Sequence, residues 1–98
     1  MAEIRWTEEA VRWLHDIYDY ISHDSPDSAQ KVIAGIYEKT QILAHFPDIG
    51  YIFRKEKDGI VRILLFGHYR IAYFVPNDET VIILGIFHSA LDISRYNI

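Results

Sequence analysis

Hydrophobic and polar positions follow two different periods along this chain. Between about residue 8 and residue 44, apolar residues recur every three or four positions, which is the spacing of a helix with one buried side. Three later segments are almost continuously β-branched, aliphatic or aromatic: Ile60–Phe66, Tyr69–Tyr73 and Val81–His88. The pattern therefore predicts a helical half followed by a stranded half.

A first strand and a first helix are expected before residue 23. Ile4–Trp6 has the residues of a short strand, and Thr7 is a suitable N-cap for a helix that runs to about Ser22. Glu8 and Glu9 then occupy the first turn, where carboxylates interact favourably with the helix dipole. The predicted buried side of this helix comprises Ala10, Val11, Leu14, Ile17, Tyr18 and Ile21.

A second helix is expected after a proline break. Proline disfavours helical geometry in the residue before it and suits the first position of a helix, so Ser25 is the predicted cap and Pro26 the first residue. We expect this helix to end near Ala44. Its predicted buried side comprises Ala29, Val32, Ile33, Ile36, Tyr37, Thr40 and Leu43. The two helices together predict an antiparallel hairpin with one shared apolar side.

The second half of the chain predicts a sheet. Tyr51–Arg54 has the composition of a short edge strand, and short polar links between the longer strands favour an antiparallel meander. The sequence therefore predicts a single domain over 1–98 of the α+β class, with a short N-terminal strand and an antiparallel helical hairpin packed on a mainly antiparallel C-terminal sheet. The segment 89–98 has only a weak helical pattern. The predicted loops and turns are 45–50, 55–59, Gly67–His68 and Pro76–Glu79.

Composition and charge narrow the class of protein. Half of the 98 residues are hydrophobic and only three are proline, which is typical of a folded domain, and the absence of cysteine excludes a disulfide scaffold. Met1 leads directly into a charged segment, and no apolar run approaches the roughly 20 residues needed to cross a bilayer, so we expect a soluble cytoplasmic protein with no membrane association. The formal net charge of -4 disfavours a general nucleic-acid binder, which usually carries a basic surplus.

Two arginines are candidate functional residues because they interrupt apolar strands. Arg62 lies in Ile60–Phe66, and Arg70 lies in Tyr69–Tyr73. An arginine keeps its charge and is costly to bury unpaired, so each should reach solvent, a carboxylate or a ligand. Arg70 belongs either to a functional surface or to a structural ion pair with an acidic residue such as Asp92. Arg62 belongs either to the same surface or to a solvent-facing side of the sheet.

Histidine and tyrosine offer further candidates. A histidine side chain titrates near neutral pH, so His88 is a candidate acid or base, although a histidine at a strand end is more often a cap or a hydrogen-bond partner. Tyr96 is a candidate catalytic tyrosine or a tail residue that covers the core. The other histidines show no spacing with Asp or Glu that is typical of a metal site, so we expect neither metal nor cofactor. The aromatic residues of the helical half are expected to pack where the helices meet the sheet: Trp6, Trp13, Tyr18 and Tyr37.

Several short motifs follow one another in a specific order. Each is weak alone, and together they run along nearly the whole chain: Trp6–Ala10, Tyr20–Ile21, Ser25–Pro26, Leu43–Pro47, Gly50, Val61–Arg62, Tyr69–Tyr73, and His88 followed four residues later by Asp92. In this order they resemble the RelE/ParE superfamily of toxins from bacterial toxin-antitoxin pairs. The resemblance implies a small α+β toxin that is held inactive by a partner antitoxin.

The superfamily has two main arms, and this chain is more similar to the ParE-like arm. RelE-like members resemble ribosome-dependent messenger-RNA endonucleases that use several cations on the sheet, an arginine after the last strand and a C-terminal tyrosine. Cleavage of a phosphodiester needs a proton acceptor and positive charge on the developing phosphorane. Arg70 matches one of those cations, but uncharged residues lie where the others would be expected: Ile63, Leu65, Ser89 and Ala90. ParE-like members lack the nuclease residues and are generally associated with inhibition of DNA gyrase.

The resemblance also implies which residues act. As a non-enzymatic inhibitor, the protein would contact its target through Arg62, Tyr69, Arg70, Tyr73 and His88. As a nuclease, it would use Arg70, His88 and Tyr96 as catalytic groups. We favour a cytoplasmic, non-enzymatic gyrase inhibitor that is neutralised by a cognate antitoxin. Two alternatives stay open: a RelE-like endoribonuclease that cuts messenger RNA on the ribosome, and a non-toxic interaction protein that has kept the fold. Many ParE-like sequences carry basic residues after the last-strand histidine, where this chain has Ser89 and Ala90.

Overall fold

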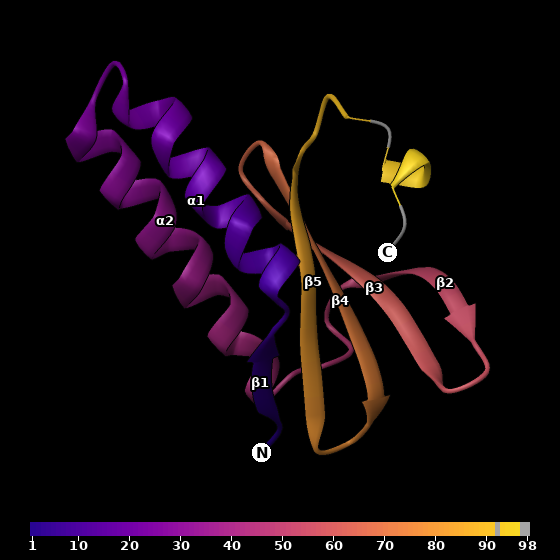
Figure 1. Ribbon diagram of the computed structural model, residues 1–98. Coiled ribbons are helices and arrows are strands. Elements are labelled where there is room, and N and C mark those ends of the chain that lie inside the picture. Colours follow the sequence, from indigo (N-terminus) through magenta and orange to yellow (C-terminus); the bar gives the residue numbers. More distant parts are fainter. Residues whose placement is uncertain (92, 97–98) are drawn as a thin grey trace.

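A helical hairpin packs beside a twisted five-stranded sheet (Figure 1). The computed structural model describes residues 1–91 and 93–96. This architecture confirms the predicted α+β class, with the sheet in the second half of the chain. The elements are β1 (Glu3–Trp6), α1 (Glu8–Ser22), α2 (Pro26–Gln41), the 3-10 turn η1 (Ile42–Ala44), β2 (Tyr51–Glu56), β3 (Gly59–Phe66), β4 (Tyr69–Asn77), β5 (Thr80–His88) and the 3-10 turn η2 (Ile93–Arg95).

The sheet has the strand order β1-β5-β4-β3-β2. Strands β2 to β5 form the predicted antiparallel meander, and β2 is the predicted edge strand, two residues longer than expected. The first strand pairs with the last one in parallel, with Ile4 opposite Val81. The chain can make this parallel pairing because α1, α2 and three strands intervene between the two partners.

Local capping signals place the two helices as predicted. The Thr7 hydroxyl accepts a hydrogen bond from the Ala10 amide (3.0 Å), and the Ser25 hydroxyl accepts one from the Ser28 amide (3.2 Å). The predicted end of the second helix at Ala44 was wrong in one respect. The α-helix ends at Gln41, and the chain tightens into η1 before the 45–50 loop.

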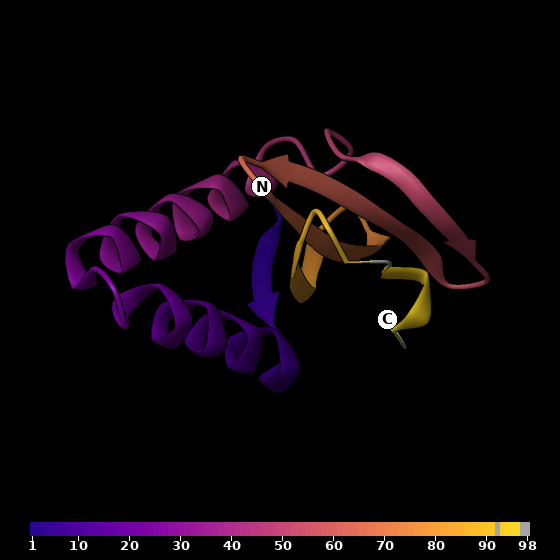
Figure 2. The ribbon, with the colours of Figure 1, turned by 90° about the horizontal axis from the view of Figure 1, so that it is seen from above.

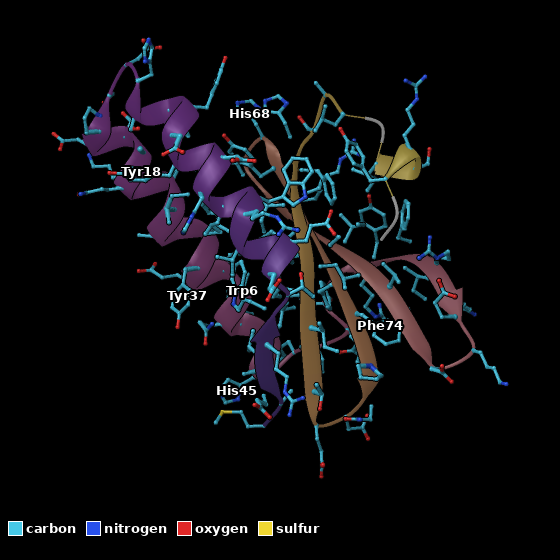
Figure 3. All side chains as sticks on the ribbon, in the orientation of Figure 1. Trp6, Tyr18, Tyr37, His45, His68 and Phe74 are labelled. Atoms are coloured by element: carbon cyan, nitrogen blue, oxygen red, sulfur yellow. The ribbon has the colours of Figure 1, made fainter. Side chains whose placement is uncertain are left out.

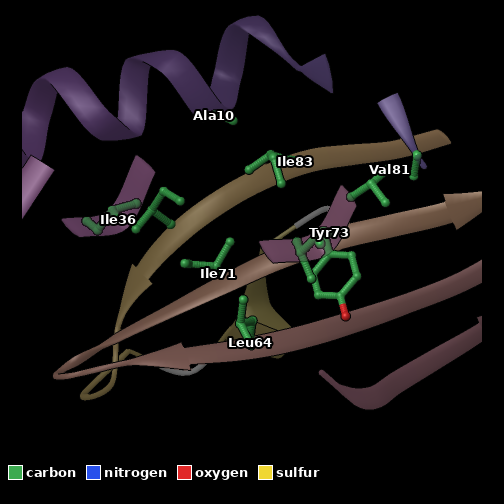
Figure 4. Packing of buried hydrophobic residues seen from close by; sticks show 10 residues of the cluster. Ala10, Ile36, Leu64, Ile71, Tyr73, Val81 and Ile83 are labelled. Atoms are coloured by element: carbon green, nitrogen blue, oxygen red, sulfur yellow. The ribbon is translucent and has the colours of Figure 1, made fainter. Parts of the chain in front are cut away.

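The main core lies between the hairpin and one face of the sheet (Figure 4). Two residues assigned to the buried sides of the helices are instead exposed: Val11 by 40% and Tyr37 by 54%. Tyr37 projects from α2 away from the sheet (Figure 3), so its predicted core position was wrong. The buried members of this cluster are Ala2, Ala10, Ile36, Leu43, Leu64, Ile71, Tyr73, Val81, Ile83 and Ile86.

A second, smaller cluster covers the other face of the sheet. Its buried members are Ile63, Ala72, Phe87 and Ile93. Ile93 belongs to η2, the yellow turn that Figure 2 shows near the C-terminal end. Among the described residues after β5, Leu91 and Ile93 therefore lie against the sheet. Trp13 of α1 packs against both clusters, so it connects the hairpin to each face.

Strand β4 is longer than its apolar pattern suggested. It continues through Val75 and Pro76 to Asn77, where a turn had been expected to begin. A proline cannot donate to a strand ladder, and the register between β4 and β5 is irregular between Phe74 and Asn77. The irregularity accommodates Pro76 within a strand that has neighbours on both sides.

Candidate functional site

An open apolar groove lies where α1 passes the C-terminal end of β5. Its volume is about 520 Å³. Strand β1 pairs with β5 only as far as Ile83, and the chain then turns through Thr7 into α1, which follows the remaining edge of β5. The groove is lined by Trp13, Asp16, Ile17 and Tyr20 of α1, by Tyr69 and His88 of the sheet, and by Leu91.

Two of the predicted site residues meet in this groove. Tyr69 at the start of β4 lies directly opposite His88 at the end of β5, and their rings contact edge to face with centroids 5.7 Å apart. The ring of His68, in the β3–β4 turn, is stacked with that of His88, with centroids 6.1 Å apart. The Ala90 amide donates to His88 Nδ1 (3.1 Å), so the neutral imidazole carries its proton on Nε2. In this tautomer Nδ1 is occupied as an acceptor and Nε2 is a donor.

The Tyr69 phenol is held in its neutral form. Burial raises the pKa of Tyr69 above its ordinary value, and the nearby Tyr20 phenol raises it further. Tyr20 and Tyr69 both line the groove. Each is an aromatic group with a polar tip, and Tyr20 is 83% exposed.

Arg70 lies on the opposite face of the sheet from Tyr69. Its strand partners are Leu65 and Phe87, and Phe87 belongs to the smaller cluster. Arg70 Nη2 donates to the Ser89 carbonyl oxygen (3.2 Å), and the Ser89 amide donates to the His68 carbonyl (2.7 Å). The half-buried guanidinium thus holds the turn after β5. Its predicted alternative partner, Asp92, lies outside the residues that the structure describes.

Arg62 and Tyr73 lie elsewhere and hold the loop before β2. Arg62 Nη1 donates to the carbonyl oxygens of Gly50 (2.7 Å) and Asp48 (3.2 Å). The Tyr73 hydroxyl donates to the Pro47 carbonyl (2.8 Å) and accepts from the Gly50 amide (2.9 Å). Tyr73 has 0% exposure, so it has no surface with which to contact a target. We therefore remove it from the predicted target-binding residues.

Tyr96 packs in an aromatic group beside the groove. Its ring centroid lies 5.6 Å from that of Trp13 and 5.1 Å from that of Phe87, and the last two are 4.7 Å apart. This packing is consistent with the interpretation of Tyr96 as a tail tyrosine that covers the core. The structure brings Tyr69 and His88 together, places Arg70 behind them through Ser89, and separates all three from Arg62.

Sequence reasoning missed the contribution of α1 to this site. Trp13 and Ile17 were assigned to the core, and Asp16 was assigned no role. A weak signal was present, because Tyr20 lies off the apolar side of the helix and yet is a large aromatic residue. Within 1–91 and 93–96 the structure has no group of three or more Asp, Glu or His side chains placed to hold a metal ion, and no helix there is long and apolar enough to cross a membrane.

Fold and groove together define a small α+β protein whose open apolar surface lies between its helical hairpin and its last strand. The family described as "ParE toxin of type II toxin-antitoxin system, parDE" matches residues 4–93. The chain therefore belongs to the ParE toxin family, and the expected ParE-like arm of the superfamily is confirmed.

Two known proteins illustrate the similarity. A solved structure described as "Chromosomal ParDE TA system from P. aeruginosa" has a TM-score of 0.72 and 27% sequence identity, and the match covers 90% of this chain and 96% of that chain. A curated protein of Sinorhizobium fredii (strain NBRC 101917 / NGR234), described as "Putative toxin Y4kP", is 45% identical over 47 residues. That match spans 48% of this chain and 49% of the relative, so about half of each chain is compared.

Proposed function

We propose that this protein is a cytoplasmic ParE-like toxin that inhibits DNA gyrase by binding it, without catalysing a reaction, and that a cognate antitoxin neutralises it. Membership of the ParE toxin family supports the toxin activity and the antitoxin partner. Gyrase is the target with which ParE-like toxins are generally associated.

One observation carries the choice of a binding protein over a nuclease. At the end of β5, Arg70 is already bonded to the Ser89 carbonyl, and His88 Nδ1 already accepts from the Ala90 amide. A ribonuclease of this kind needs a free base and several cations around one phosphate. Leu65, next to Arg70 across the strands, is 58% exposed and supplies neither. The site therefore favours protein contact.

The groove also supports an antitoxin that binds as a single segment. A concave apolar volume of about 520 Å³ takes a few side chains of a chain that becomes ordered when it binds. A segment of this kind gains affinity from burial of apolar surface and loses some of it to the entropy of ordering.

The decisive experiment is induced expression in a bacterium with and without the neighbouring gene product. We expect growth arrest only without it, with altered supercoiling of a reporter plasmid and continued protein synthesis during the first minutes. Purified protein should inhibit gyrase in a supercoiling assay, and the neighbouring gene product should co-purify with the toxin at micromolar concentration.

The alternative is tested in a reconstituted translation reaction. If the protein, free of antitoxin, produces message ends at fixed codon positions that disappear with Arg70→Ala, the ribonuclease assignment replaces the gyrase assignment. If expression alone has no effect on growth, supercoiling or translation, the non-toxic alternative is correct.

A further inference from the structure

The groove beside β5 contains aromatic rings and one carboxylate but no cation. Trp13, Tyr20, Tyr69 and His88 supply an indole, two phenols and an imidazole, and Ile17 and Leu91 supply aliphatic surface. Asp16 lies at the border of the groove on α1. None of the lining residues is a lysine or an arginine.

The Asp16 carboxylate has no partner of its own. Within 1–91 and 93–96, it forms no ion pair and no side-chain hydrogen bond. The cation closest to it in sequence is Arg12, one helical turn earlier, and both residues line a second hollow together with Glu9, Trp13 and Tyr96. The Asp16 carboxylate therefore borders both the aromatic groove and the hollow that Arg12 lines.

Aromatic faces and a carboxylate are complementary to the same chemical group. A lysine ammonium or an arginine guanidinium is attracted to the faces of Trp and Tyr rings, and the interaction strengthens when it is partly removed from water. Burial raises the pKa of Tyr69 above its ordinary value, which favours the uncharged phenol. A carboxylate at the rim adds a charge-assisted hydrogen bond.

We infer that the groove binds a segment of the antitoxin that inserts one lysine or arginine among Trp13, Tyr20 and Tyr69, where the cation pairs with Asp16. Aliphatic side chains on either side of that cation cover Ile17 and Leu91. The inference rests on the proposed function for the identity of the partner. It adds the chemical class that the groove selects, which is a basic residue within an apolar segment.

A titration of the purified full chain tests the cation directly. The probes are N-acetyl-arginine N-methylamide and N-acetyl-norleucine N-methylamide, which have similar aliphatic stems and differ in charge. We expect the arginine probe to cause saturable NMR shifts of the Trp13 indole N–H, with an affinity about threefold to tenfold higher than that of the norleucine probe. Asp16→Asn should remove most of this difference. Equal affinities for the two probes, or no effect of Asp16→Asn, would overturn the inference.

A second experiment uses the complex with the neighbouring gene product. Calorimetric titration should give a Kd about threefold to tenfold weaker for Asp16→Asn and weaker still for Asp16→Lys, with a smaller salt dependence for both than for the wild type. Asp58→Asn removes the same charge from the turn between β2 and β3, far from the groove in the sheet order, and should leave Kd unchanged.

The two experiments separate the inference from the proposed function. Tight binding of the partner that is indifferent to Asp16 overturns the basic-residue inference and leaves the antitoxin proposal intact. No binding of the partner to the wild type overturns the antitoxin proposal. In that case the outcome with the two small probes decides whether the groove is a cation site for another partner.

Discussion

The interactions that stabilise the charges of Arg62 and Arg70 could not be predicted from the apolar pattern of the strands. Each was expected to reach solvent, a carboxylate or a ligand, and each is partly exposed while it also donates to backbone carbonyl oxygens: Asp48 and Gly50 for Arg62, and Ser89 for Arg70. Loop carbonyl groups that are removed from water need hydrogen-bond donors. Each guanidinium therefore gains acceptors for its N–H groups and at the same time supplies donors to the loop carbonyls.

Replacing Arg62 should therefore destabilise the protein. Arg62→Met keeps the aliphatic stem and removes both hydrogen bonds to the 48–50 carbonyls. We expect a loss of about 1.5–3 kcal/mol in the free energy of unfolding, measured in urea, because the bonds come from a charged donor. Arg5→Met is the matched control, since Arg5 is exposed and pairs only with Glu3. An equal effect of the two substitutions would contradict this role.

Replacing Arg70 should reduce toxicity much more than it reduces the stability of the fold. Arg70→Ala removes one hydrogen bond to the Ser89 carbonyl, which costs about 1 kcal/mol in stability, and it also removes the cation beside the end of β5. We expect growth inhibition to disappear while the fold persists, and Arg70→Lys to restore part of the activity. A sharp fall in melting temperature with full toxicity would assign Arg70 to structure alone.

Tyr73 should make the protein sensitive to alkali. Burial raises the pKa of Tyr73 above its ordinary value of 10.0, an effect that the Gly50 bond and Arg62 only partly offset. Above about pH 10 the unfolded chain releases this proton and the folded chain retains it, so the stability that is present below pH 10 falls as the pH rises. Tyr73→Phe should lower stability by about 1–3 kcal/mol at pH 7 and lose less of it between pH 9 and about pH 11. Tyr37→Phe, at an exposed position, should behave as wild type.

The loop before β2 is fixed by its surroundings more than by its own sequence. A Cβ on Gly50 would lie 2.6 Å from the Ile63 carbonyl oxygen and 2.7 Å from the Tyr73 hydroxyl. Gly50→Ala should therefore displace the loop and cost about 1–3 kcal/mol, measured by thermal unfolding. Gly67→Asn is a suitable comparison, because Gly67 has a φ of 56° and open space around its Cβ position, and asparagine tolerates that conformation. If both variants melt alike, close packing at Gly50 is not the constraint.

Interactions between residues close in sequence allowed the helices and strands to be predicted. Interactions between residues far apart in sequence were not predicted. Thr7, Ser25 and Pro26 act on neighbouring backbone groups, so the helix starts could be read directly. The inward position of Tyr73 depends on a loop more than 20 residues earlier in the chain. The groove likewise needs α1 beside β5, and no pattern within either element specifies that contact.

The two hydrophobic clusters are joined through Trp13. This side chain packs against the main core and against the smaller cluster, where it contacts Phe87 and Tyr96. Trp13→Ala should cost about 3–5 kcal/mol and loosen the segment after β5, visible as faster amide exchange at Ile93. Tyr20→Ala is the control. Tyr20 lies on the same helix and is 83% exposed, so its replacement should leave both measurements near wild type. Faster exchange at Ile93 in both variants would contradict the connecting role of Trp13.

Because β1 pairs with β5, the toxin cannot complete its fold until β5 has been synthesised. Strand β5 lies between β1 and β4, and α1 packs on it, so the hairpin has no completed sheet to pack against until residues 80–88 have left the ribosome. A bacterial chain grows at about 5–20 residues per second, so the helical half waits for several seconds as an exposed, unfolded or partly helical segment. A nascent toxin therefore cannot complete its fold until β5 is available, and an antitoxin already present at that moment would meet the toxin as it folds.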